Sequence, residues 1–319
     1  GRAAAAAPAP PRRAVATVVC SDSWLPGALA LAASLIHTNT SGDRVLVVTH
    51  NVSAKYLEIA SSVFHKIYVQ EPIVPHAILT RANADCLTMQ LRAWQLPYDK
   101  VIYMDADMIA VANQDHLYNT KGELGAVSEV NKSDARLDYF NGGMFVITPS
   151  EATFAKLRGQ LATRPARRNA TTWMTGMTYF LNEAFPNCTA SGKSSQYRIG
   201  CWSDKFGDEN NVYTRLLSGW DATELWYNRG ASAVKSLHYN GNWNSVQPKP
   251  WMAGCSWHEG SFVTNPETGP VLVGIWRREF ERLKLIGGEH LQAHLQSAYA
   301  KQRERLLPKT PCGMTIYKP

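Results

Sequence analysis

The chain has 319 residues, of which 45% are hydrophobic and 10% aromatic, which is enough to bury a large core in one domain or two closely packed ones. A formal net charge of +7 is compatible with nucleic-acid binding, but the positive residues are scattered and no nucleic-acid motif occurs. The charge instead suits anionic nucleotides and an acidic acceptor. No apolar run reaches the length of a membrane span, so we expect no transmembrane helix within these residues.

The first 13 residues are rich in alanine and proline and are predicted to be disordered or extended. Such a segment suits a stem between a membrane anchor upstream of residue 1 and a catalytic domain. A plain flexible tail is the alternative interpretation.

Cysteine and asparagine patterns bear on the cellular compartment. Six cysteines occur without a Cys-x-x-Cys pair, which argues against a zinc or redox motif. Cys188 and Cys201 bracket a polar segment that a disulfide could close in an oxidising lumen; free thiols in the cytosol are the alternative. The secretory reading, in the Golgi or endoplasmic reticulum, also draws on weak sequons at Asn39, Asn51, Asn131, Asn169 and Asn187.

Strands and helices are predicted to alternate through the first hundred residues. This rhythm predicts an α/β fold with a mostly parallel sheet, whose ligands bind beyond the carboxyl ends of its strands. We expect strands at 14–20, 44–49, 66–70 and 100–104, and helices at 25–38, 54–64 and 87–95.

The second half is less regular and contains no internal repeat. A domain over 14–270 is expected, with a polar insertion at 163–207 and a C-terminal helical extension over 271–319 packed on it. The elements expected there are a glycine turn leading into a strand at 141–148, a helix at 151–161, a strand at 236–241 and helical residues 275–307, interrupted at Gly287 and Gly288.

Asp105 and Asp107 directly follow the apolar strand expected at 100–104. Residues two apart in a strand point to the same side, so a strand end would aim both carboxylates at one place. Two adjacent carboxylates repel each other unless a cation lies between them, and a bound Mg²⁺ or Mn²⁺ can in turn hold phosphates. The pattern therefore predicts a metal–diphosphate site; an Asp-rich turn after a core strand is the alternative.

Residues 101–111 resemble the metal-binding core of nucleotide-sugar glycosyltransferases of the GT-A fold, which is Rossmann-like. The flanking segments are similar to glycosyltransferase family 8, the family of glycogenin, galactinol synthase and bacterial lipopolysaccharide galactosyltransferases. Five segments stand in the family's order: the opening strand, loop and helix at 17–29, the helix and turn at 87–100, the Asp-x-Asp core, the sugar-binding turn at 138–143, and a closing His238 to Gly241 followed by Lys249-Pro250-Trp251.

The resemblance implies a Mn²⁺ site, with Mg²⁺ as the other candidate, whose ligands are Asp105, Asp107 and His238. It also implies that Lys249 places a positive charge near the phosphates. Without the resemblance, His238 reads as a satisfied strand-end histidine and Lys249 as a solvated loop residue.

The resemblance assigns further residues to the nucleotide and the donor sugar. Trp24 stacks on the uracil ring, and the backbone of the loop before it reads the base edge. Each assignment has an alternative without a ligand. Trp24 would be a core aromatic, Arg81 a solvated loop residue and Ala106 a spacer. The segment at 141–143 would be a common Asn-Gly turn. The residues assigned to the nucleotide are Val18, Val19, Cys20, Ser21, Trp24 and Ala106, and those assigned to the donor sugar are Asp138, Asn141 and Gly142. Arg81 is assigned to the phosphates and the sugar, and Gly241 belongs to the closing motif.

Two departures from the family pattern concern the reaction. The family usually has a lysine where this chain has Gln90. It also has a carboxylate under the reacting carbon, for which two segments compete. We assign this role to Asp208, or to Glu209 beside it; the alternative places Met177 there and leaves no carboxylate.

The resemblance thus implies a retaining, Mn²⁺-dependent transfer of a sugar from a UDP-sugar to a glycan, a protein or a small hydroxyl acceptor. The oligomeric state is left open. One alternative is a non-catalytic relative that only binds UDP-sugar. The other is a phosphatase of the haloacid dehalogenase type with an aspartate nucleophile, a fold that needs its Asp pair on the first strand.

Overall fold

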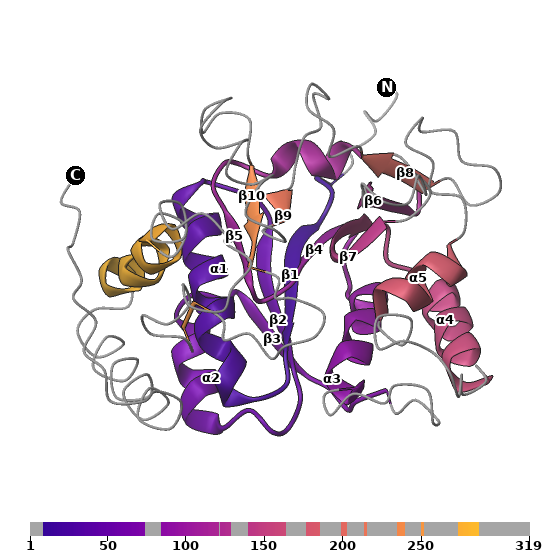
Figure 1. Ribbon diagram of the computed structural model, residues 1–319, viewed down its shortest axis with the longest axis horizontal. Coiled ribbons are helices and arrows are strands. Elements are labelled where there is room, and N and C mark those ends of the chain that lie inside the picture. The colour runs from indigo at the N-terminus through magenta and orange to yellow at the C-terminus, as the bar shows by residue number, and fades with distance from the viewer. Residues whose placement is uncertain are drawn as a thin grey trace, which may run out of the picture.

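The computed structural model describes residues 9–73, 84–120, 122–128, 140–163, 177–185, 199–202, 214–215, 235–239, 250–251 and 274–286. At the centre of this part of the chain lies a seven-stranded sheet of order β3-β2-β1-β4-β7-β6-β8. Helices cover both of its faces (Figure 1). The predicted α/β class is confirmed.

The first half of the sheet is parallel, as the alternation of strands and helices predicted. β1 lies between β2 and β4, and β3 pairs with β2 at the edge. The helix predicted to end at residue 64 stops at Ser61, and a turn there returns Phe64 to the core. The elements are β1 (Arg13–Val19), α1 (Leu25–His37), β2 (Asp43–Val48), α2 (Ala54–Ser61), β3 (Lys66–Val69) and β4 (Lys100–Met104).

The other half of the sheet contains an antiparallel strand. β7 (Phe140–Ile147) runs antiparallel to both β4 and β6 (Leu124–Ser128), and β8 (Ile199–Trp202) adds a parallel edge to β6. The glycine turn expected at 141–143 is part of β7, so that prediction was wrong. A Cβ at Gly142 would lie 2.6 Å from the Thr178 hydroxyl, so the missing side chain allows close packing rather than a turn.

A second, three-stranded sheet joins distant parts of the chain. β10 (Ser236–His238) pairs antiparallel with β5 (Met108–Ala110) and parallel with β9 (Thr214–Arg215). In this register His238 is the partner of Met108. The strand expected at 236–241 thus places a histidine next to the turn that follows β4.

Strand β1 shows how the core divides between the two faces of the main sheet. Ala14, Ala16 and Val18 point toward the helical segment before β4, whereas Val19 packs against α1 and α2. The segment before β4, predicted as one helix, is a short α-helix followed by a 3-10 helix. The remaining helical elements are η1 (Asp22–Trp24), α3 (Ala84–Thr88), η2 (Met89–Gln95), η3 (Asp115–Asn119), α4 (Glu151–Thr163) and α5 (Met177–Ala184).

Part of the predicted insertion at 163–207 is built into the core. The α5 residues Met177, Phe180 and Leu181 recur at helical spacing and are at most 3% exposed. The following β8 extends the main sheet. The domain limits themselves stay predictions.

A helix over 274–286 packs beside α1 (Figure 1). Its Glu279 carboxylate lies 3.1 Å from His37 of α1, and Leu283 is fully buried. This agrees with the expected C-terminal helix, whose continuation after residue 286 lies outside the described residues. Among the helices that the structure describes, none is long and apolar enough to cross a membrane.

Candidate metal centre

The Asp pair lies in the turn between β4 and β5, not within a strand. The Asp105 amide donates to the Gly143 carbonyl of β7 at 2.8 Å, and the Met108 amide donates back to the Asp105 carbonyl at 3.1 Å. A turn, rather than the alternation of side chains along a strand, therefore brings the two carboxylates together. The expected convergence is correct, but its assumed cause was wrong.

His238 completes the group from the second sheet. Its Nε2 atom lies 3.1 Å from Asp107 Oδ1 and 3.8 Å from Asp105 Oδ2. One ligand atom from each of the three residues lies within 4.8 Å of the others. His238 is 2% exposed and Asp107 6%, whereas the Asp105 side chain is 27% exposed, so the centre is buried on the side of His238 and Asp107 and reaches solvent at Asp105.

The electrostatics of the centre fit a divalent cation. Burial, followed by the charge of Asp107, raises the pKa of Asp105 to about 6, although His238, Tyr103 and Gln90 act in the opposite direction. Two carboxylates with restricted access to water are unfavourable as neighbours until a cation neutralises them. Two carboxylates and one imidazole are ligands that suit Mn²⁺, and Mg²⁺ less well.

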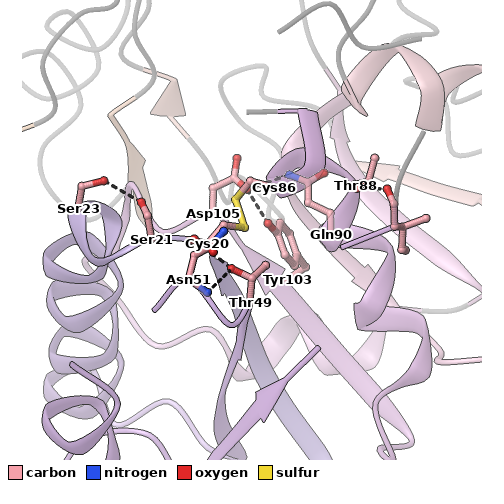
Figure 2. The surroundings of a disulfide bond; sticks show 11 residues. Cys20, Ser21, Ser23, Thr49, Asn51, Cys86, Thr88, Gln90, Tyr103 and Asp105 are labelled. Atoms are coloured by element: carbon pink, nitrogen blue, oxygen red, sulfur yellow. Dashed lines mark hydrogen bonds between the residues drawn. A yellow bond between two sulfur atoms is a disulfide. The ribbon is translucent and has the colours of Figure 1, made fainter. Parts of the chain in front are cut away.

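Gln90 and Tyr103 hold one oxygen of Asp105. Gln90 Nε2 donates to Asp105 Oδ1 at 3.0 Å, and the Tyr103 hydroxyl donates to the same atom at 2.8 Å (Figure 2). Burial and the Asp105 charge raise the pKa of Tyr103 well above its ordinary value, so its hydroxyl keeps the proton that it donates. The sequence identified Gln90 only as a missing lysine; this contact between η2 and the turn was not predicted.

Trp24 occupies η1, immediately after the loop that follows β1. Its ring meets Trp251 edge to face, with centroids 5.8 Å apart. The Trp251 indole donates to the Ser23 carbonyl at 2.9 Å, so the end of the Lys-Pro-Trp segment is docked on η1. A Cβ on Gly27 would lie 2.5 Å from the Trp251 ring and would also press on the Ala106 carbonyl, so only glycine fits there.

A disulfide joins the end of β1 to the helix before η2. Cys20 and Cys86 are bonded, with Cα atoms 5.5 Å apart (Figure 2). The sequence contained both cysteines, but nothing in their spacing indicated that β1 and α3 would bring them together. The expected pair cannot be compared, because Cys188 and the Cys201 side chain lie outside the described residues.

The start of β7 is fastened to α5. The Gly142 amide donates to the Thr178 hydroxyl at 3.1 Å, and the Asn182 side chain both accepts from and donates to the backbone of Phe140, each at 2.8 Å. Met177, at the beginning of α5, is 2% exposed and belongs to the apolar core. The segment that competes for the catalytic carboxylate thus lies beside the strand that carries Asn141.

Some of the residues predicted to bind ligands are described by the structure, and others lie outside the described part of the chain. Val18 and Val19 end β1, and Cys20 and Ser21 directly follow it. Asn141 is described only by its backbone, within β7. The predicted residues that are not described are Arg81, Asp138, Asp208, Glu209, Gly241 and Lys249.

Comparison with known proteins gives a consistent result. A family model described as glycosyl transferase family 8 matches residues 16–255. The chain is 27% identical over 249 residues to UDP-glucuronate:xylan alpha-glucuronosyltransferase 2 of Arabidopsis thaliana, covering 76% of this chain and 36% of that protein. It is 28% identical over 151 residues to glycogenin-1 of Homo sapiens, covering 46% and 42% of the two chains. The matches therefore span less than half the length of these relatives.

Two solved structures share the fold. The glycosyltransferase GlyE of Streptococcus pneumoniae aligns with a TM-score of 0.55 and 15% identity, over 90% of this chain and 64% of that one. The WbbM bifunctional glycosyltransferase aligns with a TM-score of 0.53 and 16% identity, over 84% and 52%. These alignments confirm the expected GT-A fold.

Proposed function

Because the chain belongs to glycosyltransferase family 8, we propose that it transfers a sugar from a UDP-sugar to a hydroxyl acceptor, with Mn²⁺ bound by Asp105, Asp107 and His238. The observation that carries this proposal is the buried contact between His238 and the Asp pair at the carboxyl ends of the parallel strands. Sheets of this kind bind their ligands at that edge. The phosphatase alternative loses its support, since the Asp pair follows the fourth strand of the chain rather than the first.

Different residues around the centre are proposed to bind different parts of the UDP-sugar. When bound, Mn²⁺ neutralises the negative charge on the diphosphate of UDP, which is the leaving group. The loop from Val18 to Ser21 and the half-buried Trp24 are proposed to hold the uracil base; the support is their place directly after β1. Asp138, Asn141 and Gly142 are proposed to hold the donor sugar, since β7 runs beside the Asp105 turn.

A retaining outcome needs a group that steadies positive charge at the reacting carbon. We assign this to Asp208, or to Glu209. Met177 at the start of α5 presents a buried thioether rather than a carboxylate, so that segment offers no charge at this residue.

The donor, acceptor and compartment are further parts of the proposal. The names of several relatives contain UDP-glucuronate, so UDP-glucuronate is the first donor to test within a panel of UDP-sugars. A hydroxyl of a glycan or protein is the acceptor. An oxidising secretory lumen is supported by the Cys20–Cys86 disulfide, because such bonds persist there and are rare in the cytosol.

The test is UDP release from a panel of UDP-sugars with Mn²⁺, in the absence and presence of hydroxyl acceptors. We expect release from one donor, loss of that release in Asp107→Asn, and normal release in the surface control Glu58→Gln. Asp208→Asn should abolish release, whereas Met177→Leu should leave most of it.

A second candidate function is a non-catalytic protein that binds UDP-sugar. The neutral Gln90 favours it, because the family resemblance leads us to expect a lysine there. The alternative alignment favours it as well, because it places the apolar Met177 where the family has a carboxylate. Tight binding of UDP-sugars, without release of UDP from any donor, would establish this second function and overturn the first.

A further inference from the structure

Gln90 is the side chain of the metal centre for which the proposed reaction has no role. We infer that Gln90 is a positioning residue that, together with Tyr103, fixes Asp105 so that its Oδ2 oxygen alone faces the cation. This inference rests on the proposed function, since it takes the Asp105–Asp107–His238 group to be a working cation site.

The hydrogen bonds at Asp105 separate the roles of its two oxygens. Oδ1 accepts from Gln90 Nε2 at 3.0 Å and from the Tyr103 hydroxyl at 2.8 Å, and Figure 2 shows both side chains directed toward it. Oδ2 points toward His238 Nε2, 3.8 Å away, and therefore toward the other ligands. A carboxylate held by two donors on one oxygen cannot rotate to present that oxygen to an ion without breaking both bonds.

The backbone that carries Gln90 is itself fixed. The side chain is 6% exposed, and its neighbours Met89 and Leu91 are fully buried. Just before them, the Thr88 hydroxyl donates to the Ile73 carbonyl at 2.7 Å, and Cys86 is bonded to Cys20 at the end of β1 (Figure 2). η2 therefore presents the Gln90 amide to Asp105 from a rigid element.

The surroundings of the other amide atom, Gln90 Oε1, indicate what the side chain does. Gln90 Oε1 is buried, and none of the described residues donates a hydrogen bond to it. Exchanging the two ends of the amide would place Oε1 against the Asp105 carboxylate, which is an unfavourable contact between two acceptors. Burying an amide oxygen without a donor is destabilising, so the described contacts support the glutamine only through the N–H group that it offers to Asp105.

The Gln90 amide is neutral, so it leaves the charge balance of a divalent site unchanged. Two carboxylates and a neutral imidazole carry a charge of −2, which one divalent ion balances, and an amide donates without changing this sum. A lysine, which the family usually has at this position, would offer the same hydrogen bond and would add a positive charge beside the ion. A glutamate would supply no donor when ionised and would repel Asp105.

The test is Mn²⁺ affinity of the protein without donor or acceptor, measured by calorimetric titration. We expect Gln90→Leu to weaken Mn²⁺ binding about tenfold or more, as is usual when a partner of a metal ligand is removed. Gln90→Lys keeps a donor and should still weaken binding, with a loss that shrinks at high salt because the repulsion is screened. The matched control is Gln95→Leu on the same 3-10 helix, whose exposed amide contacts Glu151 and should leave the affinity unchanged.

Tyr103→Phe keeps the inference testable if Gln90→Leu does not fold, because it removes only a hydroxyl and keeps the ring stacked on Phe145. We expect it to weaken Mn²⁺ binding severalfold. In the double variant Gln90→Leu/Tyr103→Phe, the fold-loss of Mn²⁺ affinity should be smaller than the product of the two single losses, since both hydrogen bonds hold the same oxygen.

Folded Gln90→Leu and Tyr103→Phe proteins that bind Mn²⁺ within twofold of the wild type would overturn the inference and leave the proposed function intact. A wild-type protein that binds neither Mn²⁺ nor Mg²⁺ would instead overturn the proposed cation site and this inference with it.

Discussion

His238 Nε2 lies 3.1 Å from Asp107 Oδ1, and the amide of the next residue, Tyr239, donates to the Asp107 carbonyl at 2.9 Å. The side chain and the backbone of β10 thus fix the turn after β4 from two directions. The metal centre is therefore complete only when β10 has paired with β5, so binding of a cation should stabilise the second sheet as well as the turn.

Replacing Asp107 by asparagine should remove a ligand while keeping the volume of the side chain. We expect the Mn²⁺ affinity to fall about 100-fold or more, since even indirect partners of a metal ligand change affinity 10- to 100-fold. Glu58→Gln, an exposed change of the same kind on α2, is the control. Equal Mn²⁺ affinity of Asp107→Asn and wild type in calorimetry would exclude Asp107 as a ligand.

The pH dependence of the metal-free protein follows from Asp105, whose pKa is raised to about 6 by burial and by Asp107. Because this value is above the pKa of an unfolded aspartate, the folded state binds more protons between the two values. The free energy of unfolding should therefore rise as pH falls through about 6 toward 4, as far as this group contributes.

Thermal unfolding with a chelator over this pH range measures the effect of Asp105. Asp105→Asn should raise the stability at pH 7.5 by about 1 kcal/mol and flatten the dependence. With Mn²⁺ present, the wild type should instead lose metal-induced stability below pH 6, because protons compete with the ion. A chelated wild type that is no more stable at pH 5 than at pH 7.5, with the same profile in Asp105→Asn, would contradict this account.

A substitution at Gly27 tests the docking of Trp251 on α1, the helix that follows η1. A methyl group there would lie 2.5 Å from the Trp251 ring, and we expect Gly27→Ala to destabilise the protein by about 1–3 kcal/mol. The control is Gly159→Ala in α4, where a Cβ meets no atom within 4 Å. That change should stabilise by up to about 1 kcal/mol, because alanine is the better helix former. Similar denaturation midpoints for the two variants would show that Trp251 does not pack here.

The Cys20–Cys86 disulfide closes a loop with a sequence separation of 66 residues. Replacing both cysteines by serine should lower the free energy of unfolding by about 2–4 kcal/mol, since the bond restricts the unfolded chain. A reducing agent should lower the free energy of unfolding of the wild type by a similar amount and leave that of the double variant unchanged. Chemical denaturation with and without reductant measures this, and insensitivity of the wild type would argue against the bond.

The parallel half of the fold was predictable because its strands are short apolar runs that alternate with helical segments along the chain. Strands such as β1 and β2 lie within one residue of their expected bounds. The antiparallel strand β7 was predicted only as a strand after a turn. Its glycines suggested the turn, whereas the structure uses Gly142 to let Thr178 approach.

The convergence of Asp105, Asp107 and His238 was predictable, but the contacts that support them were not. Asp105 and Asp107 are two residues apart, and the position of His238 came from a family resemblance. Gln90 lies at the centre because η2 packs against β1, and Cys86 of α3 is bonded to Cys20 at the end of β1; neither relationship has a local signal in the sequence. The sequence shows glutamine where the family usually has a lysine, but the hydrogen bond from Gln90 to Asp105 follows only from the fold.

The most direct test of the central claim is the affinity for UDP with Mn²⁺ and with a chelator, measured by calorimetric titration on the wild type and on His238→Ala. We predict that UDP binds the wild type at least tenfold more tightly with Mn²⁺, and that His238→Ala loses most of this difference. Equal affinity for UDP with and without Mn²⁺ in the wild type would contradict the account.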